Sequence, residues 1–137
     1  MIKIEYRYCA ICGSNHIIEN HHIFYRSQVK QLENCKKNQI DLCKKCHTKV
    51  HNDFLTDYKL KIELLNYYEM IFDNKNFTFE EIQSILDVNY NAMYRLSKNM
   101  KNQKGKYTRE SILLAIQGGE DTQQRYEKWM EEKRCFK

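Results

Sequence analysis

The chain has 137 residues, enough for one ordinary domain or two very small ones. No apolar run approaches the roughly 18–20 residues that cross a bilayer, and the N-terminal stretch lacks the apolar core of a secretory signal, so we expect a cytoplasmic protein with no membrane partner. The net charge of +5, from 23 Lys and Arg against 18 Asp and Glu, is compatible with a polyanionic partner without demonstrating one.

The first half of the chain is expected to form short strands followed by a helical segment. Alternating or β-branched stretches predict three strands, at residues 1–8, 16–22 and 39–42. Residues 24–37 are polar and basic, which favours an extended loop. From Lys44 to about Phe72 apolar residues recur at helical spacing, and residues 73–76 predict a break.

The second half is expected to be mainly helical. Apolar spacing predicts four helices, at residues 78–86, 89–100, 109–117 and about 121–134, with a basic loop at 98–107. Thr78 and Glu81 have the spacing of a capping box, and Asn89 and Thr108 are suitable N-caps. Gly118, with the glycine after it, predicts the end of the third of these helices.

Four of the six cysteines form two Cys-x-x-Cys pairs, which are Cys9 with Cys12 and Cys43 with Cys46. A two-residue spacer lets both thiolates of a pair reach one ion, and zinc takes about four ligands in a tetrahedron. We therefore predict one structural zinc site, with free thiols or adventitious pairing as the alternative. Neither of the other two cysteines, at positions 35 and 135, has a partner in this pattern.

All five histidines lie between positions 16 and 51. His47 and His51 are four residues apart and share one helix face, where they can meet the pair His21-His22 from a strand. His16 fits no pattern, and we expect it to be structural or exposed.

Together these positions carry a resemblance. The pattern Cys9-x2-Cys12, His21-His22, Asn38-x3-Leu42-Cys43-x2-Cys46-His47-x3-His51 resembles the zinc-stapled HNH endonuclease family, whose active centre is a ββα-metal motif. The resemblance spans residues 9–51, about a third of the chain. One departure is that residues 27–37 contain no glycine, whereas relatives often have a glycine-rich stretch there.

The resemblance implies a role for each matched residue. His22 would be the general base, and Asn38 would hold its imidazole in the correct orientation and tautomer. His21, His47 and His51 would ligate one catalytic divalent ion. Three imidazoles without a carboxylate favour a borderline transition metal over Mg²⁺, although Mn²⁺, Ni²⁺, Zn²⁺ and Mg²⁺ all stay open. Arg26 would contact a phosphate, with a solvated loop arginine as the alternative.

Residues 77–117 are similar to a helix-turn-helix segment of the excisionase type. In such a segment the outer face of the second helix reads DNA, and here that face would carry Tyr90, Asn91, Tyr94, Arg95 and Lys98. The alternative is that three short amphipathic helices simply pack on the nuclease module. The expected fold class is thus α+β, with a ββα-metal (HNH) module at residues 1–72 and a mainly helical unit at 77–137.

The function that we expect is a metal-dependent DNA endonuclease or nickase, of homing or mobile-element type and encoded by a host, a phage or a mobile element. The alternative is a non-catalytic, zinc-stabilised DNA-binding regulator. A third hypothesis is an interaction protein that docks a partner through Tyr126, Trp129 and Met130, but intramolecular packing of these side chains is favoured. DNA is the expected partner, and the chain acts as a monomer or a homodimer.

Overall fold

The N-terminal part of the chain forms a two-stranded antiparallel hairpin followed directly by a helix. In this computed structural model, which describes residues 6–73 and 75–134, β1 (Ile18–His22) pairs with β2 (Gln39–Cys43). Ile18 lies opposite Cys43 and His22 opposite Gln39. Helix α1 (Lys44–Asn52) begins at the residue after β2. The predicted order of two strands and a helix is confirmed.

The loop between the strands is more regular than its polar sequence indicates. It contains two short 3-10 helices, η1 (Lys30–Leu32) and η2 (Lys36–Asn38). Val29, Leu32 and Cys35 are almost fully buried, so the loop contributes its own apolar side chains to the core. These buried residues explain why a loop without glycine adopts a defined path.

Two predictions for the first half are wrong in detail. The predicted helix from Lys44 to about Phe72 is two helices, because Asp53 has extended backbone angles (φ −125°, ψ 109°) between α1 and α2 (Phe54–Ile71). Both helices bury apolar side chains, so the apolar periodicity continues from one helix into the next. The periodicity alone therefore does not indicate the break at Asp53. Residues 6–8 are not in a strand, and the rest of the predicted first strand lies outside the described residues.

The helices of the second half begin where their capping residues predict. Helix α3 (Phe79–Leu86) has both bonds of the capping box between Thr78 and Glu81, and Asn89 and Thr108 cap the helices that follow, α4 (Tyr90–Ser97) and α5 (Arg109–Ile116). The predicted basic loop is wrong, since it contains the hairpin of β3 (Asn102–Gln103) and β4 (Lys106–Tyr107).

The turn of that hairpin consists of two residues in the left-handed region. Lys104 has φ +53° and Gly105 has φ +84°, which is the backbone geometry that two-residue hairpin turns require. A lysine at the first of these positions gives little sequence signal for such a turn, because Asn, Asp and Gly are the residues usually found there. The hairpin was therefore not apparent from residue types alone.

One buried apolar cluster runs through both halves of the chain. The ring of Phe72, at the end of α2, makes an edge-to-face contact with Phe77 at 5.2 Å between centroids. Cys35 from the hairpin loop is fully buried between the hydroxyl of Tyr68 and the carbonyl of Leu86. Whether residues 1–72 and 77–137 are separate domains stays a prediction, but their apolar side chains share a core.

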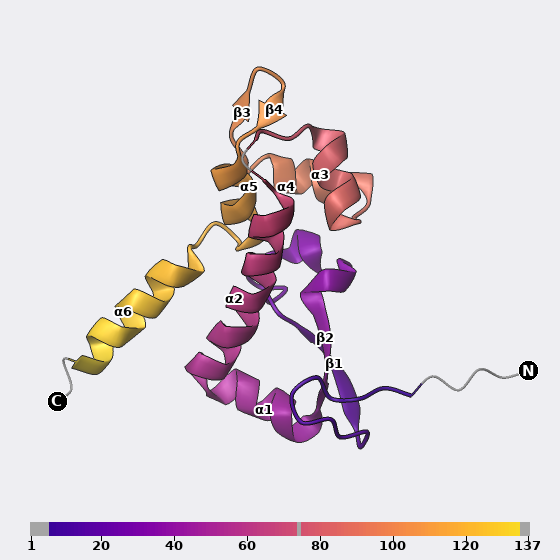
Figure 1. The fold of residues 1–137 in the computed structure, drawn as a ribbon, viewed down its shortest axis with the longest axis vertical. Coiled ribbons are helices and arrows are strands. Elements are labelled where there is room, and N and C mark those ends of the chain that lie inside the picture. Colours follow the sequence, from indigo (N-terminus) through magenta and orange to yellow (C-terminus); the bar gives the residue numbers. More distant parts are fainter. Residues whose placement is uncertain (1–5, 74, 135–137) are drawn as a thin grey trace, which may run out of the picture.

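Figure 1 shows α2 at the centre, with the hairpin and α1 toward one end and α3, α4 and α5 toward the other. The last helix, α6 (Thr122–Arg134), slants away and contacts α2 through aromatic rings. Phe54 stacks on Trp129 at 4.9 Å, and Tyr58 stacks on Tyr126 at 4.6 Å. The intramolecular packing that we favoured for these α6 aromatics is confirmed.

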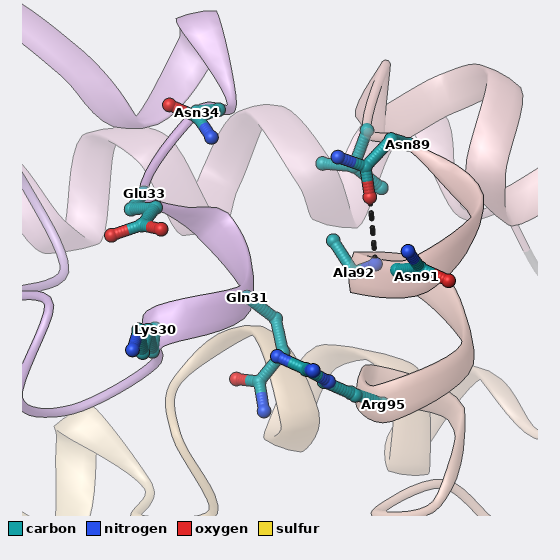
Figure 2. Close-up of a pocket in the computed structure, with 9 residues that line it drawn as sticks. Lys30, Gln31, Glu33, Asn34, Asn89, Asn91, Ala92 and Arg95 are labelled. Carbon is teal, nitrogen blue, oxygen red and sulfur yellow. Dashed lines mark hydrogen bonds between the residues drawn. The ribbon is translucent and has the colours of Figure 1, made fainter.

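Helix α4 also contacts η1, and a cleft lies between them (Figure 2). This contact brings the second helix of the helix-turn-helix-like segment against the loop that separates His22 from Asn38. Among the helices described, none has both the length and the apolar character to cross a bilayer.

Candidate metal centres

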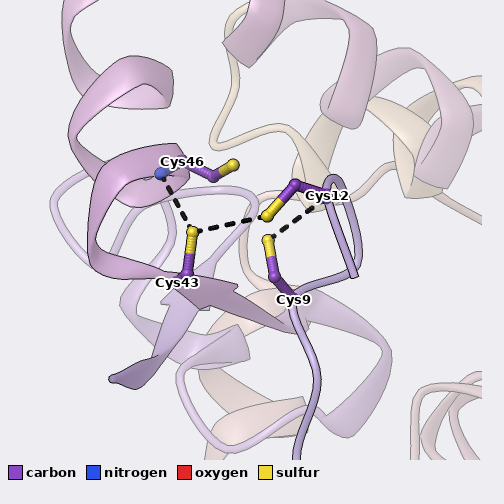
Figure 3. Close-up of side chains that lie close together, drawn as sticks. All are labelled: Cys9, Cys12, Cys43 and Cys46. Atoms are coloured by element: carbon purple, nitrogen blue, oxygen red, sulfur yellow. Dashed lines mark hydrogen bonds between the residues drawn. The ribbon is translucent and has the colours of Figure 1, made fainter. Parts of the chain in front are cut away.

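The four cysteines of the two Cys-x-x-Cys pairs converge on one point (Figure 3). Cys9 and Cys12 lie on a turn before β1 that is closed by a hydrogen bond from the Gly13 N–H to the Cys9 carbonyl, 2.9 Å long. Cys43 ends β2 and is the N-cap of α1, and Cys46 lies in the first turn of that helix. The predicted cysteine cluster is therefore present. It joins the turn before β1, which carries Cys9 and Cys12, to the start of α1.

The spacing of the sulfurs suits a tetrahedral metal ion. All four lie within 4.8 Å of one another, and the Cys12 and Cys43 sulfurs are 3.6 Å apart. A tetrahedron with Zn–S bonds of about 2.3 Å has S–S edges of about 3.8 Å. The described cysteines are all free thiols, so no disulfide among them competes for these sulfurs.

The electrostatics of the cluster also favour a cation. Burial and hydrogen bonds with neighbouring sulfurs raise the pKa of Cys46 to about 12. Burial acts the same way on Cys9, but backbone N–H groups that point at its sulfur outweigh it and lower its pKa to about 6. The Cys9 thiol thus ionises readily, whereas the Cys46 thiol keeps its proton unless a cation is present. The cluster can hold a structural zinc ion, which would stabilise the remaining thiolates.

A second cluster consists of three histidines from two elements. His21 lies on β1, while His47 and His51 lie one turn apart on α1. The ring centroid of His21 is 4.9 Å from that of His47 and 5.2 Å from that of His51, and the Nε2 atoms of the last two are 3.1 Å apart. The structure therefore brings together the three side chains proposed as metal ligands.

The donor set of this cluster fits a divalent ion. His21 is 2% exposed, and its Nε2 is buried without a hydrogen-bond partner among the described residues. The pKa of His21 is lowered to about 4, first by burial and then by the neighbouring His47 and His51. A neutral imidazole whose buried Nε2 has no partner is a suitable ligand, and leaving such an atom unpaired is otherwise costly.

The rings of the cluster are held by side chains that the sequence analysis did not identify. Nδ1 of His47 lies 3.5 Å from a carboxylate oxygen of Glu19, which leaves its Nε2 to face His51. A carboxylate behind a ligating histidine fixes the tautomer and raises its basicity. Glu19 precedes His21 by two residues on the same strand face, so the period of a strand was the available signal.

Tyr25 also contacts the histidine cluster. Its ring centroid lies 5.3 Å from that of His51 and 5.7 Å from that of His21. The Tyr25 hydroxyl donates to Asp57, 2.8 Å away, and the ammonium of Lys61 donates to the other oxygen of Asp57, also at 2.8 Å. The Lys61 side chain is only 5% exposed, and it lies over the Tyr25 ring. This network connects α2 to the histidine cluster.

His22 is not one of the rings in this cluster. It is half-buried at the end of β1, and its Nε2 lies 2.8 Å from the backbone carbonyl of Glu33. A carbonyl oxygen can only accept, so Nε2 carries a proton and the neutral ring keeps its lone pair on Nδ1. The loop between the strands therefore fixes the tautomer of His22.

Asn38 is fully buried and bonded to the backbone of the same loop. Its side-chain oxygen accepts from the Phe24 N–H at 2.8 Å, and its amide donates to the carbonyls of Phe24 and Leu32. We expected Asn38 to hold the His22 imidazole in the correct orientation and tautomer, and that role stays a prediction. Within the described chain the three side-chain hydrogen bonds of Asn38 close the loop.

The remaining predicted site residues lie on the surface. Arg26 forms an ion pair with Glu33 at 2.9 Å. His16, which the sequence did not assign to the site, is exposed as expected. The five expected α4 residues divide between two faces: Asn91 and Arg95 line the cleft toward η1, whereas the rings of Tyr90 and Tyr94 stack with each other and Lys98 lies over Tyr94.

Comparisons of the chain with protein-family models, with curated proteins and with solved structures find no match.

Proposed function

We propose that the chain is a metal-dependent endonuclease or nickase of the HNH type, which hydrolyses phosphodiester bonds in DNA. The observation that carries this proposal is the convergence of three imidazoles, including the unpartnered Nε2 of His21, one residue before a histidine with a fixed tautomer. The cysteine cluster, with its zinc, would hold β1 and α1 in the relative positions that this convergence needs.

The chemistry divides between the histidine cluster and His22. A divalent ion held by His21, His47 and His51 would supply Lewis-acid polarisation of the phosphate and neutralise charge on the leaving oxygen. His22 Nδ1 accepts a proton from the attacking water as the new P–O bond forms and the P–O3′ bond breaks. The Glu33 carbonyl holds the opposite ring nitrogen and stabilises the imidazolium that results, as an acceptor placed behind a general base does.

Asn38 acts in this scheme as a positioning residue. Its three hydrogen bonds fix the loop at Phe24, two residues after His22, and at Leu32, which directly precedes Glu33. A neutral carboxamide does this without adding a charge beside the general base. Removal of the amide would therefore loosen the loop and displace the Glu33 carbonyl.

A second candidate function is the non-catalytic DNA-binding regulator. It is favoured by one observation, namely that the Asn38 bonds are explained by loop structure alone, and a three-histidine site can also hold a structural ion. The regulator function does not explain why the tautomer of His22 is fixed. For that reason we place it second.

The deciding experiment is cleavage of supercoiled plasmid by the purified, zinc-loaded protein with Mn²⁺, Ni²⁺, Mg²⁺ or Zn²⁺ added in turn. We expect nicked or linear product with at least one ion and none in chelator. His22→Ala should lower the rate by about 10²–10⁴-fold, which is the usual contribution of a general base.

The matched control is His16→Ala, which removes an exposed histidine outside both clusters and should cut like the wild type. Metal content and the circular dichroism spectrum of both variants should equal those of the wild type. A wild-type protein that binds DNA but cuts with none of the four ions would overturn the nuclease proposal in favour of the regulator.

A further inference from the structure

The cleft between η1 and α4 is lined mainly by polar side chains and has a volume of about 210 Å³ (Figure 2). Its cations and carboxamides are Lys30, Arg95, Gln31, Asn34, Asn89 and Asn91. Small-molecule pockets typically have about 300–1,000 Å³. This cleft therefore suits one unit of a larger, extended ligand better than an enclosed metabolite.

The two cations of the cleft are not neutralised by the protein. Lys30 and Arg95 are exposed, and in the described chain neither has a carboxylate within ion-pair distance. The one carboxylate in the lining, that of Glu33, is already paired with Arg26 at 2.9 Å. The cleft thus presents net positive charge, which favours an anionic ligand such as a phosphate.

The carboxamides add hydrogen-bonding groups of both kinds. Each Asn or Gln side chain offers a carbonyl acceptor and an amide donor, and this combination pairs with the edge of a nucleotide base. The Asn89 oxygen is already used to cap α4 at the Ala92 N–H, 2.8 Å away, so its amide is the part that can donate to a ligand. Cations beside carboxamides match the backbone and bases of a nucleic acid strand.

The cleft is linked to His22 through a single residue. The backbone carbonyl of Glu33 accepts from His22 at 2.8 Å and from the Gln39 amide at 2.9 Å, and Glu33 is also one of the residues that line the cleft. A strand bound in the cleft would therefore run beside the residue that orients the proposed general base.

We propose that this cleft binds the DNA strand next to the phosphate that is cut, with Lys30 and Arg95 on a backbone phosphate and Asn34 and Asn91 on a base edge. The proposal rests on the proposed function and deepens it, because it assigns DNA contacts to η1 as well as to α4. Tyr90 and Tyr94, which stack with each other, do not line the cleft and are not part of this site.

The test uses the double variant Lys30→Ala/Arg95→Ala and a labelled DNA duplex, with no divalent ion beyond the bound zinc. Fluorescence anisotropy should show at least about tenfold weaker binding, and the slope of log K against log salt should become shallower by about one for each phosphate that the variant no longer neutralises. The matched control is Lys101→Ala/Lys106→Ala, which removes two exposed cations outside the cleft. It should bind within about threefold of the wild type, since only long-range attraction is removed.

A second variant distinguishes contacts to the DNA bases from contacts to the backbone phosphates. Asn34→Ala/Asn91→Ala should change which positions of a mixed-sequence substrate are bound or cut while leaving the salt dependence unchanged. The side chains substituted in both cleft variants are exposed, so the melting curves of these proteins should match that of the wild type. Weakened binding can then be attributed to the cleft itself and not to unfolding.

The outcomes distinguish the two proposals. Cleft variants that bind and cut like the charge control overturn the cleft assignment and leave the nuclease intact. Wild-type binding that depends on the cleft, without cleavage by any of the four ions, overturns the nuclease and supports the cleft as a DNA-binding site. A wild-type protein that neither binds duplex DNA nor cuts plasmid with any of the four ions overturns both, and one that cuts without binding in this assay overturns the cleft assignment alone.

Discussion

The hairpin module of β1, β2 and α1 and the helical unit of α3, α4 and α5 are stabilised in different ways. The module buries apolar side chains of its loop and of α1, and its strands and α1 also meet at the cysteine cluster, the histidines and a buried polar network around them. The helical unit has caps at the starts of its helices and a buried apolar interior. The candidate metal ligands thus lie between the elements of one region, whereas the α4 side chains proposed to contact DNA lie on the surface of the other.

This contrast predicts that metal removal unfolds only one region. Cys43→Ser, or a strong chelator, should release about one zinc ion per chain and unfold the hairpin module, because structural zinc contributes roughly 10–16 kcal/mol in small zinc-dependent units. Elemental analysis would measure the zinc, and amide NMR spectra would show which signals lose dispersion. Cys35→Ala is the control, since it removes a buried thiol outside the cluster and should retain zinc. Loss of chemical-shift dispersion throughout α3, α4 and α5 would contradict the prediction that only the hairpin module unfolds.

The Tyr25–Asp57–Lys61 network provides the next largest expected effect. Asp57→Ala leaves the Lys61 ammonium buried without its partner, which should lower the free energy of unfolding by roughly 3–5 kcal/mol. Chemical denaturation of the zinc-loaded protein would measure this loss. Asp57→Ala combined with Lys61→Met also removes the buried, unpaired ammonium group and should recover most of the stability. A double variant as unstable as the single one would show that the ion pair is not the cause.

The third prediction concerns the contact between the two regions. Gly118, after α5, has φ +74°, and a Cβ there would lie 2.2 Å from the Gln28 carbonyl oxygen in the hairpin loop. Gly119 has φ +85° but no atom within 4 Å of such a Cβ. Gly119→Ala should cost about 1–2 kcal/mol from backbone strain alone, and Gly118→Ala about 1–3 kcal/mol more, because the backbone of the loop must also move.

Thermal or chemical unfolding of the two alanine variants would measure the difference between them. Equal losses of stability would mean that the close approach of the α5 C-terminus to the hairpin loop is not required. A larger loss for Gly118→Ala would instead show that the helical unit supports the loop that carries Asn38 and Glu33.

The two candidate metal clusters were predictable because each depends on short-range spacing. A two-residue spacer brings Cys9 and Cys12 together in a turn, and four residues place His47 and His51 on one helix face. The paired histidine on a strand then meets that face through the antiparallel hairpin. Helix N-caps such as Asn89 were predictable for the same reason, since a cap bonds to a backbone N–H only three residues away.

The sequence by itself determined the short-range parts of each candidate site, which are the two Cys-x-x-Cys pairs and the histidines four residues apart, and where the helices of the second half begin, since these depend on contacts a few residues apart. Only the tertiary structure decided that α1 ends at Asn52, that Asp57 and Lys61 hold the tyrosine packed on the histidines, and that Asn38 bonds to the loop. It also decided that Arg95 and Lys30 face one cleft. Those relations join residues distant in the chain, and they depend on how the helices and the loop pack, which periodicity and spacing do not encode.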